Sequence, residues 1–278
     1  MKLVVDKETE HHALLEGIRS LPQEVDGILI VPLFLSINHN FNVELVRHME
    51  LTKGLKKKTP NSTIYTLAPY MPYSRQDESY SLFLGAPEVT PIIRILHLMR
   101  KYGTECIVTL ELHCDIEAEW LIDLHIEDLI DLRTAVIGDA KTLVAPDIGA
   151  YLRCKRIASL YGLEFAVIGK QRTSEGEIKS LGLMHGQIKG DEVLLLDDIV
   201  DSGRTLIQAV KAIQQPGIRV KAFAVHCLLT QEELEGLLDH VAMLYVSNSI
   251  EHKLKHPRLI TLDLAPGLIA KLTELFDK

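Results

Sequence analysis

Short apolar runs alternate with amphipathic stretches along most of this sequence, and this alternation restricts the fold more than any other feature. The apolar runs are nearly continuous in Leu, Ile and Val, as expected for strands of a parallel sheet that is covered on both faces. The amphipathic stretches between them have the spacing of the covering helices. We expect strands at Ile28–Val31, Thr63–Ala68, Cys106–Leu112, Thr142–Ala145, Phe165–Ile168, Val193–Leu196, Val220–His226, Met243–Ser247 and Leu259–Leu262, and helices at Val43–Leu55, Pro91–Tyr102, Ile148–Tyr161, Thr205–Gln214 and Pro266–Phe276.

The strands and helices fall into two sets, which predicts two α/β domains, each a mainly parallel sheet flanked by helices. A chain of 278 residues is long enough for two domains of ordinary size. We place the boundary near residue 140, so that residues 1–140 form the first domain and residues 141–262 the second.

Composition argues against several classes of function. The formal net charge is −8 and no long basic run occurs, which argues against a nucleic-acid surface. The four cysteines are spread out with no Cys-x-x-Cys pair, a pattern typical of buried thiols in a reducing cytoplasm. The longest apolar run, Ile28–Leu35, contains Pro32 and is too short to cross a bilayer, and the first residues lack the pattern of a secretory signal. We therefore expect a cytoplasmic protein with no membrane partner.

The segment Val193–Thr205, VLLLDDIVDSGRT, combines a strand, two adjacent carboxylates and a turn that opens a helix. Ligands of open α/β sheets bind beyond the carboxyl ends of the strands. The unpaired backbone N–H groups at the start of a helix can hold a phosphate, and the hydroxyls of Ser202 and Thr205 add donors. Asp197 and Asp198 can accept hydrogen bonds from two hydroxyls of a sugar. The residues of this segment predicted to bind a phosphorylated ribose are Asp197, Asp198, Asp201, Ser202, Gly203, Arg204 and Thr205.

This segment resembles the fingerprint shared by type I phosphoribosyltransferases and ribose-phosphate pyrophosphokinases. In that resemblance the acidic pair binds the ribose hydroxyls and the turn binds the 5-phosphate. Arg204 stands where the pyrophosphokinases usually have Gly, although some phosphoribosyltransferases carry Arg there. The resemblance implies two phosphoribosyltransferase-like domains. Leu262–Phe276 also resembles the family's closing strand and helix, so residues 263–278 are expected to join the first domain.

Three further segments are similar to the pyrophosphokinases in particular. Pro69–Asp77, PYMPYSRQD, resembles a loop whose Arg-Gln-Asp helps to hold ATP, which implies nucleotide contacts for Arg75, Gln76 and Asp77. In Leu110–Asp115, LELHCD, the residue His113 occupies the place of a histidine that binds a magnesium ion associated with ATP.

The third segment, Val144–Ala150, resembles the family's Ser-Pro-Asp-x-Gly-Gly segment. Asp147 would then serve a second metal ion or the ribose, and it is also a plausible N-cap for the following helix. Downstream, Lys170 and Arg172 match the Lys-x-Arg at the base of the family's mobile catalytic flap, which implies catalytic roles for both.

The resemblance implies a Mg²⁺-dependent enzyme, a ribose-phosphate diphosphokinase, with ATP and ribose 5-phosphate as its substrates. The C1 hydroxyl of ribose 5-phosphate would attack the β-phosphorus of ATP, giving 5-phosphoribosyl 1-diphosphate and AMP. The polar stretch Gln171–Gly190 would close over the site. The family also implies a homo-oligomer, a dimer or a multiple of one.

One family segment, Phe-x-Asp-Gly-Glu, which reaches the adenine of a neighbour's ATP, is not found, and Val25–Gly27 runs directly into the first strand. Two alternatives therefore stay open. One is a non-catalytic homologue that binds ribose phosphates or nucleotides and regulates a partner. The other is a phosphoribosyltransferase, although that activity does not explain Pro69–Asp77.

Overall fold

The computed structural model describes residues 2–3, 27–33, 35–37, 40–76, 90–172, 178–213 and 216–276. The chain forms two compact units: unit 1 is Met1–Leu129, Ser249–Glu251 and Leu264–Lys278, and unit 2 is Ile130–Asn248 and His252–Asp263. The first passage of the chain between units lies at Leu129–Ile130, before the boundary expected near residue 140. The assignment of these units as the two domains stays a prediction.

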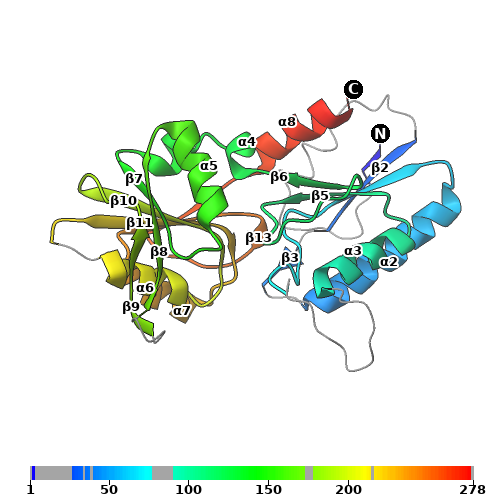
Figure 1. The fold of residues 1–278 in the computed structure, drawn as a ribbon. Helices are drawn as coiled ribbons and strands as arrows, with labels where there is room; N and C mark the ends of the chain where they lie inside the picture. Colours follow the sequence, from blue (N-terminus) through cyan, green and yellow to red (C-terminus); the bar gives the residue numbers. More distant parts are fainter. Residues whose placement is uncertain are drawn as a thin grey trace. The chain divides into compact units, whose positions relative to one another are not determined.

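Unit 1 contains a five-stranded parallel sheet in the order β1-β2-β4-β5-β6 (Figure 1). The middle of this sheet is formed from the continuous apolar runs of the sequence, and every residue of β5 is buried. The ends of the strands are β1 Lys2–Leu3, β2 Ile28–Pro32, β4 Thr63–Leu67, β5 Cys106–Leu110 and β6 Leu121–Leu124.

Helices cover both faces of this sheet, with α2 and α3 on one face and α8 on the other (Figure 1). A short parallel pair, β3 with β13, brings a segment from late in the chain into unit 1. The remaining elements of the unit are α2 Phe41–Lys58, α3 Pro91–Lys101, α4 Ile126–Leu129, α8 Ala265–Phe276, β3 Leu35–Ser36 and β13 Ile250–Glu251.

A buried polar chain fixes α2 to the sheet. His48 of α2 is buried, and its Nε2 lies 2.8 Å from the hydroxyl of Thr66. The Thr66 hydroxyl in turn lies 2.9 Å from that of Thr104. Burial lowers the pKa of His48 from 6.5 to about 4, although a hydrogen bond to the Pro32 backbone acts in the opposite direction. The imidazole is therefore neutral in the folded protein at neutral pH.

We expect this histidine to make the protein less stable in mild acid. Because the folded pKa lies below the unfolded one, the unfolded chain binds the extra proton first, and stability falls as the pH drops from about 6.5 towards about 4. A shift of this size corresponds to at most about 3 kcal/mol. Urea unfolding of the wild type and of His48→Gln across this range checks the prediction, because the variant should lose less stability. Parallel pH profiles for the two proteins would contradict it.

The backbone at the start of α8 lies close to the backbone of α4. A Cβ placed on Gly267 would lie 2.2 Å from the Leu129 carbonyl oxygen, closer than a side chain tolerates. We expect Gly267→Ala to lower the free energy of unfolding by about 1–3 kcal/mol because the helix must move to admit a methyl group. Differential scanning calorimetry measures this, with Gly236→Ala as the control, since that Cβ would meet no atom within 4 Å. Equal melting temperatures for the two variants would refute the expected clash.

Unit 2 contains a seven-stranded sheet in the order β14-β12-β11-β10-β7-β8-β9. All neighbours pair in parallel except β8 and β9, which are antiparallel. The predicted parallel α/β class is therefore confirmed. The strands are β7 Thr142–Ala145, β8 Glu164–Arg172, β9 Ile178–His185, β10 Glu192–Val200, β11 Arg219–Cys227, β12 Met243–Ser247 and β14 Leu259–Leu262.

One helix, α5 (Tyr151–Tyr161), covers one face of this sheet, and α6 (Arg204–Ile213) and α7 (Gln231–Leu238) cover the other (Figure 1). A short π-helix, Arg133–Ile137, precedes β7. The face of α6 that enters the core carries Leu206, Ala209, Val210 and Ile213. In both units together, the described helices include none that is long and apolar enough to cross a membrane.

Candidate ribose-phosphate and nucleotide sites

The acidic pair lies within a strand that is longer than the sequence predicts. The sequence predicts a strand over Val193–Leu196 that ends before the two acids, whereas β10 continues to Val200. Asp197 pairs in register with Ala224 of β11, so the backbone of both acids is held by the sheet. Both side chains are buried, Asp197 at 9 % exposed and Asp198 at 3 %. The sheet therefore holds the two carboxylates near the carboxyl end of its central strand, where ligands of such sheets bind.

The turn after β10 passes directly into α6, as the sequence predicts. Asp201 is exposed and Ser202 is half-buried, while Gly203 is buried and has a φ of +73°. A left-handed backbone favours glycine, so Gly203 is required by the turn itself and not only by the approach of a ligand. Its carbonyl accepts the first helical hydrogen bond, from Ile207 N at 2.9 Å. The exposed Arg204 and Thr205 then open the helix.

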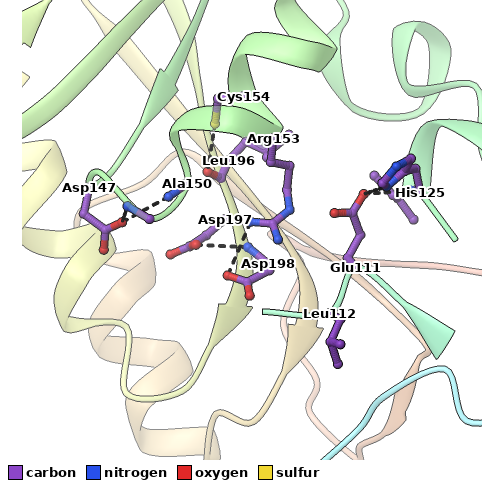
Figure 2. Close-up of polar contacts among 12 residues, drawn as sticks. Glu111, Leu112, His125, Asp147, Ala150, Arg153, Cys154, Leu196, Asp197 and Asp198 are labelled. Atoms are coloured by element: carbon purple, nitrogen blue, oxygen red, sulfur yellow. Dashed lines mark hydrogen bonds and ion pairs between the residues drawn. The ribbon is translucent and has the colours of Figure 1, made fainter. Parts of the chain in front are cut away.

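Electrostatics make the two adjacent acids unequal. The pKa of Asp197 is raised well above its usual range, first by burial and then by the neighbouring Asp198 carboxylate. Asp147 raises it further, and Arg153 acts in the opposite direction. The Asp198 backbone N–H donates to Asp197 Oδ1 at 3.0 Å, and an Arg153 nitrogen lies 3.6 Å from Asp198 Oδ1 (Figure 2). The protonated form is therefore favoured at Asp197.

Asp147 reaches the same region from the neighbouring strand. It follows β7, which pairs with β10, and its charge acts on Asp197. The sequence suggests that Asp147 caps a helix beginning at Ile148, but α5 begins at Tyr151. Asp147 instead holds the connecting turn, because its Oδ1 accepts hydrogen bonds from Gly149 N at 2.9 Å and Ala150 N at 3.3 Å (Figure 2).

Lys170 and Arg172 both lie at the end of β8, which pairs with the edge strand β9 of the same sheet. The backbone of Lys170 pairs with Leu181, and that of Arg172 pairs with Ile178. The stretch that was expected to form a lid, Gln171–Gly190, thus contains the end of β8 and all of β9. The side chains of Lys170 and Arg172 lie outside the described residues. Their roles stay predictions.

The predicted nucleotide loop belongs to unit 1 and has a strained backbone. Tyr73 has a φ of +69°, which is unusual for an aromatic residue, and its hydroxyl hydrogen-bonds Asn42 of α2. The N–H of Gln76 donates to the Tyr73 carbonyl at 2.9 Å. This turn leaves Arg75 and Gln76 exposed, while Asp77 lies outside the described residues.

His113 is presented by a second strained turn of unit 1, directly after β5. Glu111 has a φ of +44° and is buried. Its Oε1 accepts from Ile126 N at 3.0 Å and lies 3.8 Å from His125 Nδ1 (Figure 2). The Asp123 carboxylate of β6 accepts from Leu112 N at 3.0 and 3.1 Å. Hydrogen bonds of two carboxylates therefore hold the chain directly before the exposed His113.

Sequence reasoning missed three residues of these sites: Arg153, Glu111 and Asp123. Glu111 stands two positions before His113, so its proximity was a usable signal. Arg153 and Asp198 are 45 positions apart, and no local spacing connects an α5 residue to β10. Their ion pair depends on the packing of α5 against β10.

The described residues offer no group of three or more His, Cys, Asp or Glu side chains that could hold a metal ion. A single carboxylate such as that of Asp147 still fits magnesium, because this ion is usually bound by one or two carboxylates together with substrate phosphates and water. It does not fit a structural zinc site, which takes four protein ligands.

Known proteins share both the sequence pattern and the fold. Residues 122–257 match the family model described as phosphoribosyl transferase domain. A ribose-phosphate pyrophosphokinase of Sulfurisphaera tokodaii is 29 % identical over 95 % of this chain and 91 % of its own length. One from Thermosipho africanus is 26 % identical over 87 % of this chain and 77 % of its own.

A solved structure extends the comparison to the whole fold. The crystal structure of phosphoribosylpyrophosphate synthetase from Mycobacterium smegmatis covers 100 % of this chain with a TM-score of 0.75 at 20 % identity. At that identity the similarity is one of fold. Together with the sequence matches across both units, it shows that this chain is similar in sequence and in fold to the ribose-phosphate pyrophosphokinases.

Proposed function

We propose that this protein transfers the diphosphoryl group of ATP to the C1 hydroxyl of ribose 5-phosphate, giving 5-phosphoribosyl 1-diphosphate and AMP. The observation that carries the proposal is the acidic pair of β10 followed by the Gly203 turn and the start of α6. This sequence of elements supplies acceptors for sugar hydroxyls and donors for a phosphate within a few residues of each other. The named relatives support the same reaction class.

Each end of the sugar phosphate would meet a different kind of group. The first backbone N–H groups of α6, with the hydroxyls of Ser202 and Thr205, would bind the 5-phosphate. Asp197 and Asp198 would hold the two ribose hydroxyls. Because Asp198 is buried beside Arg153, a hydroxyl that binds there leaves water and gains a strong hydrogen bond to a charged group.

The nucleotide would use groups of unit 1. Arg75 would contact a phosphate or stack on the base, and Gln76 and Asp77 would orient the nucleotide. Lys170 and Arg172 would stabilise negative charge on the transferring oxygens. The β8–β9 hairpin would exclude water while the reaction proceeds. Positioning and charge neutralisation are sufficient for such a transfer, which needs no covalent intermediate on the protein.

Magnesium fits two of the predicted residues. His113 offers an imidazole nitrogen, and Asp147 offers a carboxylate whose Oδ1 already accepts two backbone hydrogen bonds. An ion at His113 and a second ion at Asp147 would each neutralise charge on phosphate oxygens. The two backbone bonds orient Asp147, and the Glu111 and Asp123 bonds fix the turn that presents His113.

One assay tests the proposal. The protein is incubated with MgCl₂, ATP and ribose 5-phosphate, and AMP is measured by chromatography. AMP formation that depends on ribose 5-phosphate supports the proposed reaction. Saturable binding of ribose 5-phosphate without AMP would instead identify a non-catalytic binding protein. Consumption of 5-phosphoribosyl 1-diphosphate with a nucleobase would identify a phosphoribosyltransferase.

We also expect a cytoplasmic homo-oligomer, a dimer or a multiple of one. Light scattering coupled to size-exclusion chromatography measures the mass, and a mass of one chain would contradict this expectation.

A further inference from the structure

Arg153 is an unusual residue on α5 because its long cationic side chain is buried, with only 9 % of the residue exposed. Other positions of the same helix, including Leu152 and Leu160, leave apolar side chains more than 60 % exposed. A buried guanidinium destabilises a protein unless it has a charged or polar partner. The burial of Arg153 therefore indicates that its guanidinium interacts with a charged or polar partner inside unit 2.

The partner of this charge is one member of the acidic pair. The Arg153 guanidinium lies 3.6 Å from Asp198 Oδ1 (Figure 2). The next residue, Cys154, donates from its Sγ to the Leu196 carbonyl at 3.3 Å. Two consecutive residues of α5 thus attach to β10 on either side of Asp197. The helix fixes the backbone before the acidic pair and one carboxylate within it.

The attachment is asymmetric. Arg153 forms its ion pair with Asp198, while Asp197 accepts the Asp198 backbone N–H and has the charges of Asp198 and Asp147 near it. The cation thus compensates the charge of Asp198 more directly than that of Asp197. The two acids have the same side chain but different environments, which is how two carboxyls of one site take different roles.

On the basis of the proposed function, we propose that Arg153 is a positioning residue of the ribose site, which compensates the charge of Asp198 and orients its carboxylate as the acceptor of one ribose hydroxyl. Asp197, which accepts the Asp198 backbone N–H, is then the group for the second hydroxyl. Two ionised carboxylates side by side would repel each other in the empty site.

Kinetics of matched variants test the assignment. Arg153→Met keeps an unbranched apolar side chain without the charge, and Arg153→Lys restores a charge without the planar fork. Lys155→Met removes a cation from the exposed part of the same helix and is the control. We expect Arg153→Met to raise KM for ribose 5-phosphate about tenfold or more with KM for ATP within about twofold, and Arg153→Lys to recover part of this loss. Unchanged KM values for both substrates would overturn the proposal.

A purely structural role for Arg153 gives a different result. It would lower the melting temperature and change both KM values together, with no recovery in Arg153→Lys, and this outcome also overturns the proposal. If the wild type makes no AMP, the proposed function fails, but the pair can still be observed directly. A pH titration of ¹³C-labelled aspartate carboxyls should show the pair taking up its second proton at higher pH in Arg153→Met than in the wild type or Lys155→Met. Identical titrations in all three proteins would overturn the assignment of Arg153.

Discussion

Lys170→Ala is expected to lower kcat about 100-fold or more and to leave the affinity for ribose 5-phosphate nearly unchanged. The reason is that a cation aimed at charge that develops during transfer stabilises the transition state and not the bound sugar. Steady-state AMP formation measures kcat, and calorimetry with ribose 5-phosphate measures binding. The backbone position of Lys170 on β8 is compatible with this role.

Lys211→Ala is a matched control, because Lys211 is an exposed cation near the end of α6. It removes one positive charge from the same unit without touching the proposed machinery. We expect its kcat to equal that of the wild type. Turnover by Lys170→Ala at the wild-type rate would remove the assigned catalytic role.

Asp198→Ala is expected to weaken the binding of ribose 5-phosphate about 10- to 100-fold. The substitution deletes the acceptor of one sugar hydroxyl, and a hydrogen bond to a charged group contributes about 1.5–3 kcal/mol. The substitution also removes the ion pair of Asp198 with the buried Arg153, so the melting temperature should fall as well. Calorimetry at a temperature well below the transition separates the loss of binding from the loss of stability.

Asp191→Ala provides the comparison for this variant, because Asp191 is exposed and lies before the start of β10. Its affinity for ribose 5-phosphate should match that of the wild type. Full affinity in Asp198→Ala would mean that the acidic pair does not bind the sugar.

The central strands could be predicted because their apolar runs are buried on both faces. β2, β4, β5, β7, β10, β11 and β12 all lie where such runs occur. β14, at one edge of the unit 2 sheet, was also predicted although none of its residues is fully buried. Edge elements were missed: β6 is largely half-buried or exposed, and β9 lies in a stretch that was expected to be a polar lid. A strand with one neighbour needs fewer apolar residues, so its pattern is weaker.

One missed helix carried a readable signal. Thr230 and Glu233 form a capping box at the start of α7, with the Thr230 hydroxyl bonded to the Glu233 backbone and the Glu233 carboxylate bonded back. The spacing Thr-x-x-Glu before an apolar run predicts such a helix start. Conversely, Asp147 was expected to cap the start of α5, but it orients the turn before that helix. An aspartate that accepts backbone N–H groups can form either a helix cap or a turn, so the sequence alone does not distinguish them.

The residues of the candidate sites also fall into those that the sequence predicts and those that it does not. Residues contiguous along the chain, such as the β10 acids and the Gly203 turn, could be grouped from the sequence because one segment contains them all. Partners that depend on packing between distant elements could not. Arg153 meets Asp198, and Asp123 meets Leu112, only after a helix or strand has been placed beside its neighbour.

The chain enters unit 1 twice after leaving it at Leu129. Ile250–Glu251 pairs with β3 before the chain returns to unit 2, and α8, which follows all of unit 2 in the sequence, packs against α4. During synthesis on the ribosome, nearly all of unit 2 emerges before α8 does. Part of the apolar surface of the unit 1 sheet therefore stays exposed to solvent until α8 has been synthesised and can pack. Chaperone binding to nascent chains should accordingly persist until translation passes α8, even though the sheet it protects was made first.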